Sequence, residues 1–165
     1  MAPGHPPLLP QAVALDLDVH GKMALLHAAA QMLKGFCRIE AEPIFRALHR
    51  REQAGSTAVG DGLAIPHARI PGIDRPLTLY LRTKVPLRFG EPDGKPVSEF
   101  FVMVVPAEGV PEMQLGLLRE VAERFSRSSF RAMLAAASSP AAVAAVFAQW
   151  SDPQDDEVEA LQGIS

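Results

Sequence analysis

The segment GDGLAIPHARIPG, residues 60–72, holds the side chain best placed for chemistry in this sequence. His67 directly follows Pro66, whose ring fixes φ and whose nitrogen carries no proton, so the backbone before the imidazole is stiff. Gly60 and Gly62 permit a tight turn that folds the LAIPH run back beside the STAV run. We expect the imidazole at a strand end, where open α/β sheets place their sites. Two interpretations follow: a nucleophile on a rigid mount, or a structural loop histidine.

The other four histidines lie in plainer settings. His5 belongs to a proline-rich start, and His49 lies near the end of an expected helix, where it can cap the dipole. His20 and His27 are spaced to share one helical face, but further ligands for a zinc ion cannot be placed. We therefore expect all four to be solvent-facing residues without a metal.

Familiar catalytic and cofactor motifs are missing. The sequence has no GxxxxGK[ST] loop, no GxSxG elbow and no HExxH helix, and the glycines of GSTAVGDG lack the context of a dinucleotide fingerprint. Cys37 is the only cysteine, which excludes an internal disulfide and a thiolate-only metal site. We expect no cofactor and no metal.

The totals are those of a globular domain. The chain has 165 residues, 48% of them hydrophobic, and a net charge of −3 with no basic stripe. This argues for one compact domain with a real core and against nucleic-acid binding. No apolar run reaches the ~20 residues of a membrane span, and the start MAPGHPPLLP has no signal-peptide pattern. We expect a cytoplasmic protein without membrane insertion.

Hydrophobic periodicity predicts the elements that must position His67. Residues 11–19 alternate as a half-buried strand, with Val13, Leu15 and Leu17 on one side. Helices follow from Lys22 to a stop at Gly35 and over residues 41–51. Strands are expected at residues 76–85 and 99–106, the second at the centre of the sheet, with a hairpin turn at residues 93–94.

The remainder is helical, and its ends are irregular. Three apolar stripes predict three helices, with these members: Leu118, Val121, Ala122 and Phe125; Phe130, Met133 and Leu134; Val143, Val146, Phe147 and Trp150. Residues 1–8 are expected to form a flexible arm and residues 152–165 an acidic, disordered tail. Residues 9–151 are then a single α/β domain, a mixed β-sheet flanked by helices.

The segment RREQAGSTAVGDGLAIPHARIPGI, residues 50–73, resembles the active-site signature of the fructose/mannitol-type enzyme IIA proteins of the bacterial phosphotransferase system (PTS). The resemblance extends from about Leu9 to about Trp150 and is strongest to the nitrogen-regulatory branch, whose members stand alone without sugar-transport segments. It implies the fold of that family and a phosphoryl-accepting histidine.

Carried over by position, the family's phosphorylated histidine matches His67, and the arginine of its RE dipeptide matches Arg51. A guanidinium suits phosphoryl oxygens because it offers fork-shaped donors and keeps its charge, although a solvated helix-end arginine is the alternative. Ser56 and Thr57 match a hydroxyl pair that would hold the arginine or the phosphate loop. Asp61 would orient the imidazole or serve only the Gly-Asp-Gly turn.

The sequence departs from the family pattern at one position. Members commonly carry a second histidine at the start of the helix after the central strand, and Gln114 occupies that position here. Gln114 is spaced to join the inward stripe of Leu118 and Val121. Its amide can donate a hydrogen bond but cannot become a cation. It is either a weaker phosphate ligand or a partly buried helix-start residue.

The resemblance implies a histidine phosphocarrier of the PTS rather than a free-standing enzyme. His67 would take a phosphoryl group from an HPr-like phosphohistidine donor and pass it to a downstream PTS component, or switch binding to a regulated transporter or kinase. The alternatives are a IIA-like regulatory binding module that is no longer phosphorylated and a sugar-transport IIA component.

Overall fold

The computed structural model describes residues 9–149, which fall into two compact parts: residues 10–109, and residues 110–149 together with residue 9. The arm expected at residues 1–8, the tail expected at residues 152–165 and the inward position expected for Trp150 lie outside the described residues. No helix within residues 9–149 has the length and apolar character needed to cross a membrane.

The first part contains a mixed sheet with the strand order β1-β5-β6-β3-β2, and β4 also pairs with β6. β5 and β6 are antiparallel, whereas β1 runs parallel to β5, and β3 and β4 run parallel to β6. β6 has partners on both edges, which confirms its predicted central place. The strands are β1 (Ala12–Leu17), β2 (Ala58–Gly60), β3 (Leu63–Ala64), β4 (His67–Ile70), β5 (Leu77–Leu87) and β6 (Val97–Pro106).

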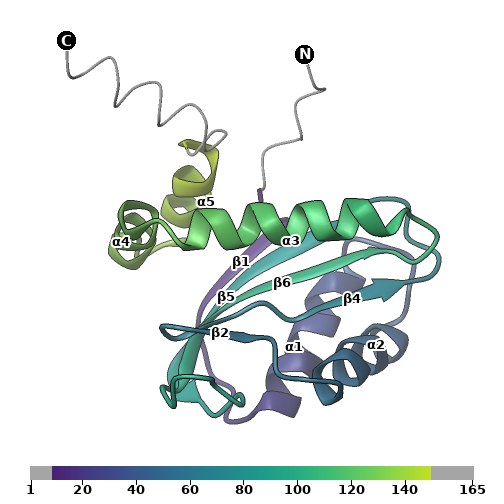
Figure 1. The fold of residues 1–165 in the computed structure, drawn as a ribbon, viewed down its shortest axis with the longest axis horizontal. Helices are drawn as coiled ribbons and strands as arrows, with labels where there is room; N and C mark the ends of the chain where they lie inside the picture. Colours follow the sequence, from purple (N-terminus) through teal and green to yellow (C-terminus); the bar gives the residue numbers. More distant parts are fainter. Residues whose placement is uncertain (1–8, 150–165) are drawn as a thin grey trace. The chain divides into compact units, whose positions relative to one another are not determined.

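Two helices cover one face of this sheet (Figure 1). α1 (Lys22–Lys34) and α2 (Ala41–Gln53) pack their apolar stripes into one core with β5 and β6. Both predicted helices are confirmed, and Gly35 caps the first as expected. The second helix continues two residues past its predicted end at Arg51, because Glu52 occupies a buried position on its inner face.

The side of β1 that faces the core differs from the prediction. Ala12 and Ala14 pack against the core, and the pairing with β5 then shifts register before Leu17. Asp16 has a φ of 53°, the left-handed conformation that accompanies the extra residue. Because such a bulge changes which side of the strand faces inward, Leu17 reaches the core while the strict alternation expected for Val13 and Leu15 does not hold.

The second part is helical, as predicted. α3 (Pro111–Phe125), α4 (Ser128–Ala136) and α5 (Pro140–Gln149) follow one another. Phe125, Phe130 and Phe147 contact each other edge to face, with ring centroids 5.3 to 6.3 Å apart. Two expected inward residues differ: Ala122 and Met133 are exposed, while Arg124 is buried.

Candidate functional site

His67 begins β4, directly after a break in the strand that runs beside β6. Leu63 pairs with Glu99, Ala64 with Phe100 and His67 with Met103, so β3 and β4 keep one register across the break. Pro66 cannot donate to a ladder, but its carbonyl accepts from the Met103 N–H at 2.9 Å. The break therefore fixes the backbone before His67 without shifting the sheet.

The imidazole of His67 is held in one tautomer. Its Nδ1 lies 2.8 Å from the carbonyl oxygen of Ile65, which can only accept, so Nδ1 carries the proton. Its Nε2 lies 3.3 Å from Nε of Arg51, which donates to the ring lone pair. This second bond is longer than the usual 2.9–3.0 Å, so the Nε2 lone pair is only weakly engaged.

Arg51 is brought to His67 by the last turn of α2. Its Nη1 donates to the carbonyl of Gly55 at 2.8 Å, and this bond fixes the direction of the guanidinium. The structure thus brings the two principal sequence-predicted residues together. Arg51 is not the freely solvated helix-end arginine of the alternative interpretation.

The pKa of His67 is lowered from the usual imidazole value of about 6.5. Burial of the ring is the largest cause, and the Arg51 charge acts in the same direction, while the bond to Ile65 and the Glu52 charge oppose them. The imidazole is therefore neutral near pH 7. A neutral ring with a proton fixed on Nδ1 presents Nε2 as a nitrogen nucleophile beside a permanent cation.

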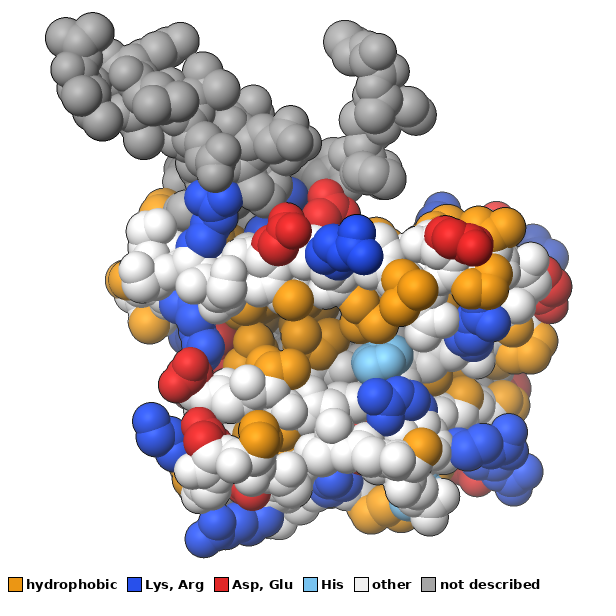
Figure 2. All heavy atoms as spheres, in the orientation of Figure 1, with side chains coloured by type: hydrophobic (Ala, Val, Ile, Leu, Met, Phe, Trp, Pro, Cys, Tyr) orange, Lys and Arg blue, Asp and Glu red, His pale blue; other side chains and the backbone are white. Residues whose placement is uncertain are grey.

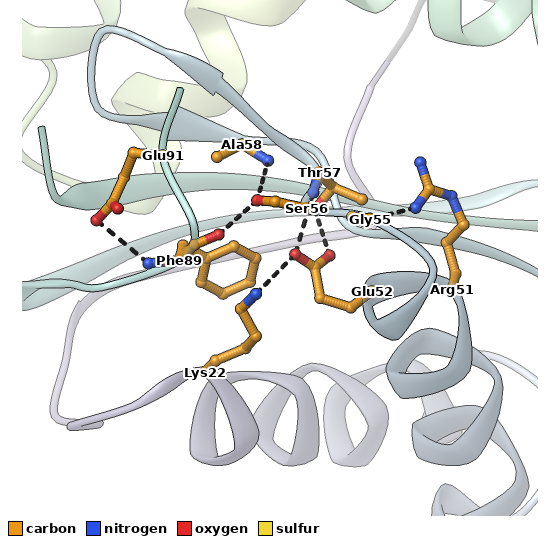
Figure 3. A network of polar contacts seen from close by, with 9 residues as sticks. All are labelled: Lys22, Arg51, Glu52, Gly55, Ser56, Thr57, Ala58, Phe89 and Glu91. Atoms are coloured by element: carbon orange, nitrogen blue, oxygen red, sulfur yellow. Dashed lines mark hydrogen bonds and ion pairs between the residues drawn. The ribbon is translucent and has the colours of Figure 1, made fainter. Parts of the chain in front are cut away.

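Ser56 and Thr57 hold the loop after α2 (Figure 3). The Ser56 hydroxyl donates to the Phe89 carbonyl and accepts from the Ala58 N–H, which links this loop to the β5–β6 connection. The Thr57 hydroxyl donates to Glu52 at 2.6 Å. Of the two roles expected for this pair, these contacts favour holding the loop.

Glu52 is a site residue that the sequence prediction missed. Its carboxylate is buried, accepts from both the N–H and the hydroxyl of Thr57, and pairs with Lys22 at 3.0 Å. A signal was present, because Glu52 follows Ile44 and Leu48 at intervals of four along α2 and so continues the inward stripe. A carboxylate on such a stripe is buried and needs partners.

The remaining predicted site residues are Asp61 and Gln114. Asp61 occupies the exposed turn between β2 and β3 with a φ of 54°, and its N–H donates to Asp93 at 2.9 Å. These contacts favour its turn interpretation. Gln114 is half-buried near the start of α3, in the other compact part of the chain.

The remaining described histidines make local contacts. His27 and His49 each stack with Phe45, with ring centroids 3.6 and 5.5 Å away, and His20 pairs with Asp18. His20 precedes α1, so the shared helical face expected for His20 and His27 does not form. Between residues 9 and 149 there is no group of three His, Cys, Asp or Glu side chains that could hold a metal ion.

A mixed sheet covered by helices and a neutral histidine beside an arginine match one protein class. The sequence family described as "Phosphoenolpyruvate-dependent sugar phosphotransferase system, EIIA 2" matches residues 7–150. The chain belongs to this family, as its signature segment predicted. It is a PTS EIIA-type phosphocarrier domain.

Within that family, the chain is related to nitrogen regulatory proteins. It is 37% identical over 116 residues to the "Nitrogen regulatory protein" of Pseudomonas aeruginosa, an alignment covering 70% of this chain and 75% of that protein. It is 30% identical to the protein of the same name from Bradyrhizobium diazoefficiens, covering 84% and 90%. The crystal structure of nitrogen regulatory protein IIA-Ntr from Neisseria meningitidis superposes with a TM-score of 0.77 at 36% identity, covering 82% of this chain and 92% of that one. These matches confirm the single α/β domain.

Proposed function

We propose that His67 accepts a phosphoryl group on Nε2 from the phosphohistidine of an HPr-like donor protein. The observation that carries the proposal is the geometry of the ring. Ile65 fixes the proton on Nδ1, and Nε2 points at the side chain of Arg51. This arrangement leaves one ring nitrogen as nucleophile and places a cation where phosphoryl oxygens would arrive.

The step is an in-line displacement at phosphorus. The Nε2 lone pair of His67 forms the new N–P bond as the donor's N–P bond breaks, and its electron pair returns to the donor imidazole. No proton has to move during transfer when the other nitrogen of the donor ring is protonated, because the donor then leaves as a neutral imidazole and the proton of His67 stays on Nδ1, hydrogen-bonded to the Ile65 carbonyl. The residues supply positioning and charge stabilisation, the two contributions on which phosphoryl transfer mainly depends.

Arg51 would neutralise the transferred group. Its guanidinium offers further donors beyond the Nη1 bond to Gly55, and it cannot lose its charge. During transfer its long bond to Nε2 gives way to bonds with phosphoryl oxygens, which are shorter and stronger because both partners are charged.

The partners follow from this chemistry. A phosphohistidine donor must dock against the His67 face, and a downstream PTS component must be able to do so in turn. A fold relative at 18% identity, IIA of the mannitol system from Escherichia coli, has been solved in complex with phosphorylated enzyme IIB. On the face in Figure 2, neither compact part shows a continuous basic stripe, which suits protein docking better than a nucleic acid. With such partners, we propose that the protein acts in the cytoplasm.

The phosphoryl group would also act as a regulatory switch. The named relatives are nitrogen regulatory proteins, and a phosphoryl group adds a charge of about −1.5 to −2 at a single surface point. Added charge at His67 would create or remove a docking face for a regulated transporter or kinase.

Gln114 keeps one competing function open. A binding module that signals without phosphorylation has no need for a second cation, and a glutamine amide supplies none. Under our proposal, Arg51 alone provides the positive charge that phosphoryl transfer requires, and no second cation is needed at position 114.

Phosphorylation can be measured directly. The full chain is incubated with phosphoenolpyruvate and the general PTS donor proteins, and its intact mass is recorded. We expect an acid-labile gain of one phosphoryl group, no gain in His67→Gln and an unchanged gain in His49→Gln, a histidine stacked on Phe45. A folded wild-type protein that gains no mass with any donor favours the unphosphorylated module and contradicts the proposal.

A further inference from the structure

We infer that Glu52 is a positioning residue for His67 and Arg51, acting on both through the loop of residues 54–57. Its effect on catalysis rests on the proposed function, whereas its effect on the geometry of the site does not. Lys22 belongs to the same arrangement, because its ammonium pairs with the Glu52 carboxylate at 3.0 Å.

Both oxygens of the Glu52 carboxylate accept hydrogen bonds (Figure 3). Oε1 accepts from the Thr57 N–H at 3.0 Å and from Lys22 Nζ at 3.0 Å, and Oε2 accepts from the Thr57 hydroxyl at 2.6 Å. The residue is only 5% exposed. A buried charge held in this way is costly to disturb, because removing one partner leaves the others unsatisfied.

One branch of the network leads to the imidazole. Thr57 donates its N–H and its hydroxyl to the Glu52 carboxylate. The Thr57 carbonyl accepts from the Ile65 N–H at 3.0 Å. The Ile65 carbonyl in turn accepts the Nδ1 proton of His67. The hydrogen bond from His67 Nδ1 to the Ile65 carbonyl selects the tautomer. The position of Ile65 depends in turn on Thr57, whose N–H and hydroxyl are both bonded to Glu52.

A second branch leads to the guanidinium. Gly55 lies between Glu52 and Thr57, and its N–H donates to the Glu52 carbonyl at 3.2 Å. The Gly55 carbonyl is the acceptor that orients Arg51. Thr57 and Gly55 are thus held by the side chain and the backbone of one residue, so that displacing Glu52 moves the supports of both site residues.

Lys22 makes this carboxylate compatible with a phosphoryl site. An unpaired negative charge so close to His67 would repel the incoming group. The Lys22 ammonium pairs with Glu52 and lies 4.5 Å from the ring centroid of Phe89, so its position is fixed on two sides. The Glu52 charge also opposes the lowering of the His67 pKa.

The test compares four variants of the full chain: Glu52→Gln, Thr57→Val, Thr57→Ser, and Glu42→Gln as a control on the same helix with an exposed Arg46 partner. Imidazole ¹⁵N NMR reports the His67 tautomer without any phosphoryl donor. The phosphorylation rate from the HPr-type donor is measured in parallel, and thermal melting shows that each variant is folded.

We expect Glu52→Gln and Thr57→Val to populate both imidazole tautomers and to slow phosphorylation about tenfold. Thr57→Ser, which keeps the hydroxyl, and Glu42→Gln should retain the Nδ1–H tautomer and the wild-type rate. If Glu52→Gln does not fold, Thr57→Val alone tests whether the Glu52–Thr57 contact controls the His67 tautomer, because it removes only the hydroxyl.

Folded variants that keep the Nδ1–H tautomer overturn the inference, even where their melting temperature falls, since that pattern describes a merely structural residue. A tautomer change in a chain whose wild type accepts no phosphoryl group supports the positioning role and contradicts the proposed function instead. The two proposals therefore fail separately.

Discussion

At His67, burial and hydrogen bonding act on the pKa in opposite directions, and burial has the larger effect. The result is a neutral ring with its proton fixed on Nδ1, which leaves Nε2 as the nucleophile of the proposed function. Arg51 completes the pair with a charge that is independent of pH. Both residues were predicted from their positions in the signature segment, and the structure adds the contacts that distinguish the two ring nitrogens.

The lowered pKa of His67 makes stability depend on pH. As the pH falls below about 6.5, the unfolded chain takes up its imidazole proton before the folded chain does, so the free energy of unfolding decreases down to the native pKa. Above about pH 6.5, the contribution of His67 to the free energy of unfolding no longer changes with pH. Urea unfolding at about pH 7.5 and 5.5 should show a smaller loss on acidification in His67→Gln than in the wild type. Equal losses would contradict a lowered pKa.

The fork geometry of Arg51 should matter beyond its charge. Arg51→Lys keeps a cation but cannot donate to Gly55 and to a phosphoryl oxygen from one planar group. We expect phosphorylation to slow about tenfold in Arg51→Lys and about a hundredfold in Arg51→Met, measured as initial rates at saturating donor. A wild-type rate in Arg51→Lys would mean that the fork geometry contributes nothing beyond the charge.

At the scale of elements, short strands and turns between α2 and β5 carry the site. β3 and β4 pair with β6 in one register as an interrupted strand, and the turn at Gly72 follows the end of β4. Gly72 has a φ of 90°, and a Cβ built there would lie 2.9 Å from Cδ1 of Ile39, a side chain packed on the core. This position requires glycine for both conformation and space.

Gly72→Ala should therefore cost more stability than Gly94→Ala. Gly94 also has a positive φ, of 73°, but a Cβ there would meet nothing within 4 Å. We expect a loss of about 1 kcal/mol for Gly94→Ala and about 2–3 kcal/mol for Gly72→Ala in urea unfolding, because a steric term adds to the strained conformation. Equal losses would show that Ile39 moves aside without cost.

The helices were predictable because their 3.6-residue periodicity is long and local. The facing of β1 was not, since one bulge at Asp16 changes which side is buried and no short-range pattern announces it. The role of Glu52 depends on Lys22 and Thr57 meeting in space, which spacing along α2 only hints at. The turn role of Asp61 likewise needed its partner Asp93.

At the scale of the whole molecule, the proposed regulatory function requires one small change in charge to become a signal. The chain carries a net charge of −3, and a phosphoryl group adds about −1.5 to −2 at one point beside Arg51. A docking partner would sense this change locally, since screening limits it to about 8–10 Å at physiological salt. A regulatory partner is therefore expected to contact the His67 face itself.

The most direct measurement is the identity of the phosphorylated atom. Protein labelled with ¹⁵N in its imidazole rings is phosphorylated from phosphoenolpyruvate through the donor proteins, and phosphorus–nitrogen coupling is recorded by NMR. We predict one phosphoryl group on Nε2 of His67, with Nδ1 still protonated and hydrogen-bonded to Ile65. A phosphoryl group on Nδ1, or on any residue other than His67, would contradict this prediction.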